Sequence, residues 1–136
     1  MAVGITVGSI TDEIGAPSFV HAFFSTISAH CEPNGWGTSF PGLMKELYQG
    51  RLSFMHSKAA LGELEQAKLL LKDLQPSQVV WDIEDRKTQP PWGNNIASTI
   101  TNLSNYFVSS TGGDVFALLE AALRASADKG RDVTLG

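Results

Sequence analysis

Apolar residues recur every three or four positions in several stretches of the chain, which is the spacing of one face of a helix. In the first stretch Val20, Phe23, Ile27 and Cys31 share one side, and Pro17 stands where proline favours a helix start. The same spacing predicts four further helices. The five lie at about residues 17–31, at residues 40–48, from a cap at Ser57 to Leu74, after a cap at Asn94 or Asn95 with Ile96, Ile100 and Leu103 on one face, and from a cap at Asp114 to Gly130.

The third predicted helix carries an apolar stripe that we expect to face the core. The stripe repeats at helical spacing, and the aliphatic stem of one lysine completes it. Its members are Leu61, Leu64, Lys68, Leu71 and Leu74. Pro76 follows and ends the helix, because proline has no backbone N–H to continue the hydrogen bonding.

Short runs of β-branched and aromatic residues predict strands. These runs lie at residues 2–10, 79–81, 106–108 and 133–135. Pro90 and Pro91 make residues 86–93 irregular. The order of strands and helices predicts an α+β fold, in which a small mixed β-sheet packs against about five helices.

The composition is that of a globular protein. The length of 136 residues fits one domain over residues 1–136, and 43% hydrophobic with 18% charged residues excludes wholesale disorder. No apolar run reaches the ~18 residues of a membrane span, and Met1 to Ile5 lack the basic residues of a secretory signal. Cys31 is the only cysteine, which excludes an internal disulfide and favours a reducing cytoplasm.

The charge is acidic along the whole chain. Ten Lys and Arg residues against 14 Asp and Glu residues give a net charge of −4. Residues 1–68 hold 4 basic and 6 acidic residues and residues 69–136 hold 6 and 8, so each half carries −2. Direct binding to nucleic acid needs a positive surface and is therefore disfavoured, whereas a basic protein partner is easy to accommodate.

Metal binding and thiol chemistry find little support among the histidines and the cysteine. His21 and His30 are nine positions apart on one predicted helix and point in opposite directions, so they cannot share a metal ion. Cys31 closes the apolar stripe of that helix, which predicts a buried, inert thiol. We expect no metal site and no cofactor.

Asp82, Glu84 and Asp85 form the most acidic cluster. In a strand, Asp82 and Glu84 would share one face. Three interpretations stay open: a solvated strand end that Arg86 and Lys87 partly neutralise, a contact with a cationic protein partner, or a metal or acid–base site.

Two tryptophans lie where they could anchor an interface. Trp92 follows the stiff Pro90–Pro91 pair, and Trp36 stands between two glycines. An exposed tryptophan on such a loop suits a binding hot spot, but each ring could equally fold back over the core. Trp81 lies in an apolar run and is expected in the core.

Several short motifs, in this order and spacing, resemble the immunity protein 70 family. The motifs are FFSTI at 23–27, WG at 36–37, FP at 40–41, LYQG at 47–50, WDIED at 81–85, PPWGN at 90–94, ITNL at 100–103 and YFV at 106–108. The match covers about residues 19–123. Members of the family are small cytoplasmic bacterial proteins encoded beside polymorphic or contact-dependent toxins. The resemblance implies a protein without catalytic residues that binds and neutralises a cognate toxin domain.

The resemblance and the acidity together predict an immunity protein whose partner is the C-terminal domain of its toxin. The negative charge favours a basic nuclease as that toxin, blocked by steric and electrostatic occlusion. The expected contacts are Asp82, Glu84, Asp85, Trp92 and Trp36. Two alternatives remain: a small hydrolase-like enzyme that uses Asp82, Glu84 and a distant histidine, and a regulatory binding module outside toxin systems. A homodimer stays open, and no membrane or direct nucleic-acid contact is expected.

Overall fold

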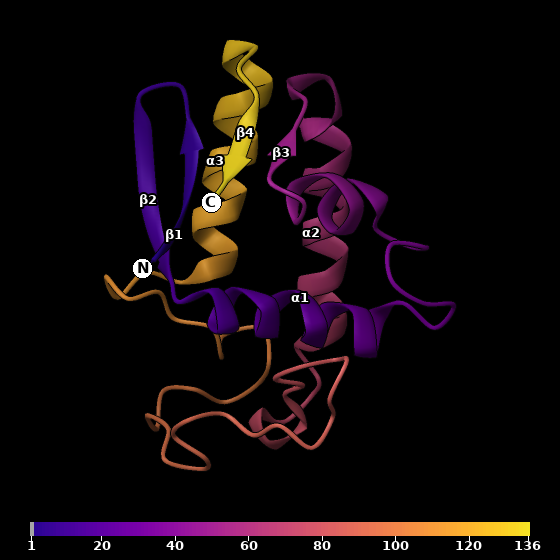
Figure 1. Ribbon diagram of the computed structural model, residues 1–136, viewed down its shortest axis with the longest axis vertical. Coiled ribbons are helices and arrows are strands. Elements are labelled where there is room, and N and C mark those ends of the chain that lie inside the picture. The colour runs from indigo at the N-terminus through magenta and orange to yellow at the C-terminus, as the bar shows by residue number, and fades with distance from the viewer. Residues whose placement is uncertain (1) are drawn as a thin grey trace.

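The computed structural model describes residues 2–136 and contains a four-stranded sheet with strand order β2-β1-β4-β3. The strands are β1 (Val3–Val7), β2 (Ile10–Gly15), β3 (Arg51–Leu52) and β4 (Val133–Leu135). All three pairings are antiparallel, so the sheet is not mixed in direction. The first and the last strand lie side by side at its centre (Figure 1).

The strand predicted over residues 2–10 is instead the first part of a hairpin that runs from Val3 to Gly15. β1 ends at Val7, Gly8 and Ser9 make the turn, and β2 returns along β1 with Ile10 opposite Val7. Gly8 has a φ of 60°, a left-handed conformation that favours glycine and suits a two-residue hairpin turn. β2 escaped prediction because it lies at the edge of the sheet, where residues 10–13 are exposed and three of the four are polar.

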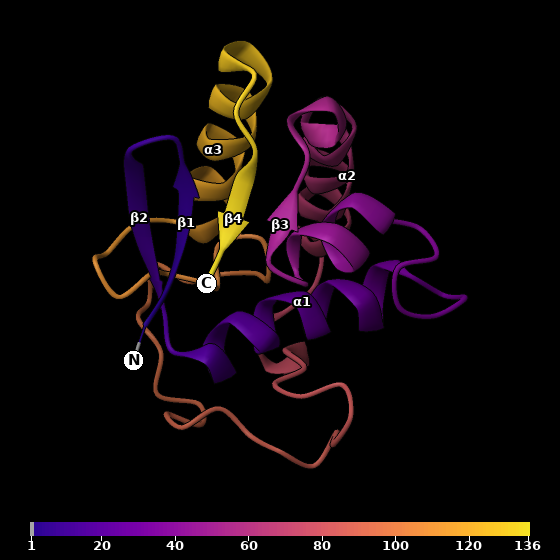
Figure 2. The ribbon, with the colours of Figure 1, turned by 45° about the horizontal axis from the view of Figure 1, so that its top comes forward.

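The fold has three α-helices: α1 (Pro17–Cys31), α2 (Phe54–Leu71) and α3 (Val115–Lys129). α2 and α3 pack side by side behind the sheet, and α1 crosses below them (Figures 1 and 2). The predicted bounds of α1 are confirmed, and its Phe23, Phe24 and Ile27 are fully buried. The α+β prediction is confirmed.

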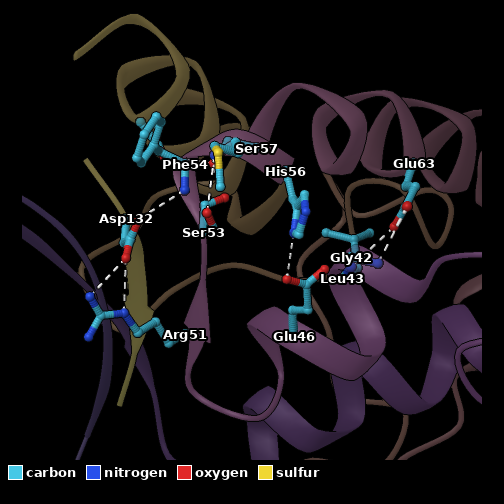
Figure 3. Close-up of polar contacts among 12 residues, drawn as sticks. Gly42, Leu43, Glu46, Arg51, Ser53, Phe54, His56, Ser57, Glu63 and Asp132 are labelled. Atoms are coloured by element: carbon cyan, nitrogen blue, oxygen red, sulfur yellow. Dashed lines mark hydrogen bonds and ion pairs between the residues drawn. The ribbon is translucent and has the colours of Figure 1, made fainter. Parts of the chain in front are cut away.

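α2 begins three residues before the predicted cap. Ser53 is its N-cap and accepts a hydrogen bond from the Met55 N–H, while Asp132 accepts one from the Phe54 N–H at 2.9 Å (Figure 3). The predicted cap, Ser57, lies inside the helix and is buried, with its hydroxyl 2.6 Å from that of Ser126 on α3. The cap prediction failed because two serines precede the apolar stripe and the sequence does not choose between them.

The stripe of α2 that packs inward is smaller than predicted. Leu64 and Leu71 are buried as expected, but Leu61 and Lys68 are only half-buried. Ser57, Ala60 and Ala67 complete the buried face. These small side chains leave room for α3 to pack closely, which the periodicity of the leucines alone did not indicate.

The short helix predicted at residues 40–48 forms as the π-helical turn η1 (Gly42–Leu47). The carboxylate of Glu63, on α2, accepts hydrogen bonds from the Gly42 and Leu43 N–H groups, which no intrahelical partner would satisfy (Figure 3). α3 and β4 were predicted correctly. Asp114 occupies the N-cap position of α3, although its side chain makes no capping hydrogen bond.

Residues 72–113 contain only one short regular element, the 3-10 turn η2 (Pro76–Gln78). The strand predicted at 79–81 and the helix predicted after Asn94 do not form, and the strand predicted at 106–108 is reduced to one bridge between Val108 and Asp114. Isolated hydrogen bonds hold this segment instead. Thr26 of α1, for example, exchanges two hydrogen bonds of 3.1 Å with the backbone of Val80.

Candidate functional site

A chain of three polar side chains joins α1, the end of η1 and the irregular segment. His21 Nε2 lies 3.0 Å from Asp82 Oδ1, and His21 Nδ1 lies 2.6 Å from the Tyr48 hydroxyl. A carboxylate only accepts hydrogen bonds, so Nε2 carries a proton and donates to Asp82. In the neutral imidazole, Nδ1 then accepts from Tyr48. The side chains of His21 and Asp82 are 23% and 32% exposed, so the chain lies at the surface.

Local contacts shift the pKa values of Asp82 and Tyr48, the two ends of this chain. The Glu84 N–H donates to Asp82 at 2.9 Å and His21 donates as well, which lowers the pKa of Asp82 below its usual value. The pKa of Tyr48 is raised by burial first and then by the negative charges of Glu84 and Asp82. Tyr48 therefore keeps its proton at neutral pH, and the chain holds groups in place without supplying an activated hydroxyl.

The acidic cluster is a turn and not a strand, so the predicted sharing of one strand face by Asp82 and Glu84 is wrong. The Asp85 N–H donates to the Asp82 carbonyl at 3.1 Å and closes the turn. Glu84 and Asp85 are exposed. Among residues 2–136, neither forms an ion pair with a Lys or Arg side chain, including the neighbouring Arg86 and Lys87. Their charges face solvent uncompensated by a direct partner.

Trp36 lies beside the polar chain. Its ring centroid is 6.4 Å from that of His21, at an interplanar angle of 24°, and 5.0 Å from that of Tyr48. The indole N–H donates to the Met44 carbonyl at 3.0 Å, which orients the ring. Trp36 is half-buried, so its ring packs partly on the protein and keeps some accessible surface.

Glu32 holds the loop that carries Trp36. Its carboxylate accepts three hydrogen bonds of 3.0 Å, from the N–H groups of Gly37, Ser39 and Phe40. Glu32 is only 4% exposed. This role was not predicted, because nothing in the sequence around Glu32 distinguishes a carboxylate that binds three backbone donors from one at the surface.

Trp92 belongs to a different cluster. It packs edge-on against Trp81 at 5.2 Å and against Phe19 at 6.4 Å, and its N–H donates to the Tyr106 hydroxyl at 2.9 Å. Trp92 as a whole is nevertheless 39% exposed. Trp81 is buried, as predicted. Of the five predicted contacts, the structure therefore brings Trp36 close to the acidic turn and directs Trp92 toward the core aromatics.

We define the acidic–aromatic surface by the residues that these contacts connect. They are Trp36, Tyr48, Asp82, Glu84 and Asp85. It combines an oriented aromatic ring with three carboxylates that lie on one turn, whose backbone the Asp82 side chain and carbonyl hold in place. Such a surface can bind a cationic partner, because the aromatic ring supplies apolar contact area and the carboxylates supply charge-assisted hydrogen bonds.

Two clefts lie in the irregular segment, away from this surface. One of about 440 Å³ is lined by Pro76, Pro90 and Tyr106 among others, and one of about 200 Å³ by Phe19, Trp92 and Tyr106 among others. Neither is lined by Asp82, Glu84 or His21. Within residues 2–136 no group of three or more His, Cys, Asp or Glu side chains is arranged to hold a metal ion.

The remaining candidate groups have structural roles. His30 Nε2 lies 2.7 Å from the Gln78 carbonyl and ties the end of α1 to η2. Cys31 is 6% exposed, and burial followed by the charge of Glu32 raises its pKa to about 11. The predicted burial of this thiol is confirmed, and the raised pKa disfavours the reactive thiolate form. Across residues 2–136, no helix has the length and apolar character that crossing a membrane requires.

Comparison with known proteins identifies the family. The family model described as immunity protein 70 matches residues 5–135, a longer stretch than the motifs of the sequence analysis covered. No curated protein and no solved structure matches the chain in the same comparisons. Because the match spans nearly all of its length, the chain belongs to the immunity protein 70 family.

Proposed function

We propose that this immunity protein binds the C-terminal domain of a cognate bacterial toxin in the cytoplasm and blocks it with the acidic–aromatic surface. Family membership supports a toxin as the partner. The observation that carries the choice of surface is the exposure of Glu84 and Asp85, without ion-pair partners, beside the oriented ring of Trp36. The cytoplasm is a reducing compartment, and Cys31, which is buried as a free thiol, fits such a compartment.

The surface is held in place before binding. His21 holds Asp82, the Glu84 and Asp85 N–H groups bond back to Asp82, and Glu32 holds the loop of Trp36. Association then costs less conformational entropy, because these groups need not be ordered when the partner arrives. The irregular backbone of residues 79–113 would otherwise be expensive to order.

The chemistry of the surface favours a basic nuclease as the toxin. A nuclease needs positive charge around its active site to hold phosphates, and the same charge attracts carboxylates. Net charge −4 on the immunity protein adds long-range attraction and raises the association rate. Inhibition would be steric: the protein covers the groove that the nucleic acid must enter.

One observation favours a second function. The order carboxylate, imidazole, hydroxyl in the Asp82–His21–Tyr48 chain has the outline of a hydrolytic triad, and it supplies the distant histidine of the enzyme alternative. The raised pKa of Tyr48 and the position of both clefts away from the chain favour the binding function over it.

Growth rescue tests the proposal. The C-terminal toxin domain encoded beside the gene is expressed in a bacterial host from an inducible promoter, with and without the immunity protein. We expect growth arrest with the toxin alone and growth with both, together with a stable complex on gel filtration. A toxin domain that arrests growth in both cultures would contradict the proposal. Inhibition of the purified toxin on a nucleic-acid substrate then distinguishes a nuclease from other toxins.

A further inference from the structure

Strand β2 forms an outer edge of the sheet. It pairs only with β1, and Figure 2 shows no strand on its other side. Residues 10–13 are exposed, and the apolar Ile10 is 58% exposed. An edge of this kind presents unpaired backbone groups, which can hydrogen-bond to an added strand.

The pairing on the other side of β1 shows which groups of β2 are free. Gly4 exchanges two hydrogen bonds with Gly136, so its peptide groups point toward β4 and not toward β2. Directions alternate along a strand, so those of Thr6 point toward β4 as well. Thr11, the residue opposite Thr6 in β2, therefore directs its N–H and C=O outward, and so does Glu13, opposite Gly4.

At the end of this edge near Gly15, β2 already has a hydrogen-bonding partner, Ser110. The Ser110 N–H donates to the Ile14 carbonyl at 2.9 Å, and the Ser110 hydroxyl donates to Glu13. Among the backbone hydrogen bonds of residues 2–136, none involves the outward groups of Thr11. The open stretch is long enough for a short added strand that pairs with Thr11 and Glu13.

A groove runs beside the open edge. It has a volume of about 210 Å³ and lies between the β1–β2 hairpin and α3. The strands contribute Ile5, Val7, Ile10 and Asp12 to its lining, and the helix contributes Ala121, Ala122, Ala125 and Lys129. The side chains of the three alanines are single methyl groups, so they leave the groove open on the side of α3. Alternate side chains of an added strand would point into this groove, since they lie on the same face of the sheet as Ile10 and Asp12.

The charges of β2 decide which strand fits. If a second copy of the chain paired through β2 in the antiparallel register that uses both Thr11 and Glu13, Asp12 of the two copies would lie directly opposite each other. Like charges in that position are destabilising, and acidic residues on an edge are a known protection against self-association. The same carboxylates attract lysine and arginine on a different chain.

We propose that β2 accepts an extended, basic segment of the toxin as a fifth strand of the sheet. The added strand carries Lys or Arg opposite Asp12 and Glu13 and an apolar residue opposite Ile10, with its backbone bonded to Thr11 and Glu13. This inference rests on the proposed function, because it takes the toxin as the partner. It adds a second contact region. There the toxin segment is bound through backbone hydrogen bonds and side-chain contacts, and not only through its positive charge.

Two substitutions at one position separate backbone pairing from side-chain effects. Thr11→Pro removes the outward N–H, and the fold tolerates it because proline is accepted at edge positions whose N–H faces solvent. Thr11→Ala keeps the N–H and is the matched control. We expect T11P to bind the purified toxin domain about tenfold more weakly in calorimetry, and T11A to bind within about twofold of the unchanged protein. Thermal melts check that both variants fold.

Hydrogen exchange gives a second, direct measurement on the unchanged protein. We expect the Thr11 and Glu13 amides to exchange fast in the free protein and to become protected in the complex with the toxin domain. Equal affinity of T11P and T11A, or unchanged exchange at both amides in a complex that does form, would overturn the added strand and leave the proposed function intact. A dimer of the free protein that T11P dissociates would also overturn it, in favour of self-pairing. If the unchanged protein neither binds the toxin domain nor protects the host from it, the proposed function fails and this inference fails with it.

Discussion

The side chains of Asp82 and His21 meet at 3.0 Å although 61 positions separate them in the sequence. The contact fastens a segment with little regular structure to the side of α1. It also places the acidic turn next to Tyr48 and Trp36, which reach the same region from elsewhere in the chain. The acidic–aromatic surface therefore depends on tertiary contacts and would not survive the detachment of residues 79–113.

This contact predicts a pH dependence of stability. The pKa of Asp82 is lowered in the folded state, so its contribution is present above the unfolded pKa and is lost as pH falls through the folded pKa. We expect the free energy of unfolding of the unchanged protein to exceed that of Asp82→Asn at pH 7, and the difference to shrink toward pH 3. Urea denaturation at several pH values measures it. A difference that stays constant with pH would show that the charge of Asp82 does not contribute.

Removal of the Glu32 carboxylate should destabilise the protein more than a surface substitution. Glu32→Ala leaves the N–H groups of Gly37, Ser39 and Phe40 without their acceptor, and unsatisfied donors of this kind cost about 3 kcal/mol in total. Urea denaturation gives the free energy of unfolding. Tryptophan fluorescence should report a changed environment of Trp36, which the same loop carries. Glu65→Ala, on the exposed side of α2, is the control and should change stability by less than about 1 kcal/mol.

Truncation of core side chains tests the packing of α1 and α2. Phe23 is 1% exposed and Leu64 is 2% exposed. Phe23→Ala should cost about 3–5 kcal/mol and Leu64→Ala about 2–5 kcal/mol, because each opens a cavity that the core cannot fill. Leu69→Ala is the matched control on the same helix as Leu64, since Leu69 is 68% exposed. Melting temperatures that fall equally for Leu64→Ala and Leu69→Ala would contradict the burial of Leu64.

Charge reversal tests the acidic–aromatic surface. Asp82 is unsuitable because His21 binds it, so the change is made at the two solvent-facing carboxylates, as Glu84→Lys with Asp85→Lys. We expect weaker toxin binding, mainly through slower association that high salt partly masks, and an almost unchanged melting temperature. Surface plasmon resonance at two salt concentrations measures both rates.

The control for this reversal carries the same change in net charge elsewhere. Asp73→Lys with Asp128→Lys alters two other exposed carboxylates, one after the end of α2 and one near the end of α3. If both double variants lose affinity equally, the effect comes from overall charge. The surface formed by Glu84 and Asp85 would then not be the contact.

The sequence predicted elements well where one face of the element is buried. α1 was predicted to the residue because Val20, Phe23 and Ile27 repeat at helical spacing and all face the core. The helix expected after Asn94 shows the converse. Ile96 and Ile100 have helical spacing, but Ser, Thr and Asn between them favour turns, and in the structure the two isoleucines pack from an irregular backbone.

The candidate site was predicted in part. Charge singled out the acidic turn, and the glycines around Trp36 singled out its loop. His21, Tyr48 and Glu32 were not assigned to the site, because their roles come from contacts 27 and 61 positions away or from a buried carboxylate that binds backbone donors. A single sequence carries no direct record of such pairs. Trp92 was predicted as a contact because of its loop. Its hydrogen bond to the Tyr106 hydroxyl, 14 positions away, could not be inferred from that loop.

The position of β4 bears on how the cell makes this protein. β4 pairs with β1 and β3 in the interior of the sheet, yet residues 133–135 leave the ribosome after every other element. Until they emerge, β3 has no neighbour in the sheet and β1 pairs only with β2, so the complete sheet cannot form before residue 135 has been synthesised. Contacts this distant in sequence also slow folding. A chain interrupted anywhere before residue 133 would therefore lack the strand that joins the β1–β2 hairpin to β3, and its sheet would stay in two separate parts.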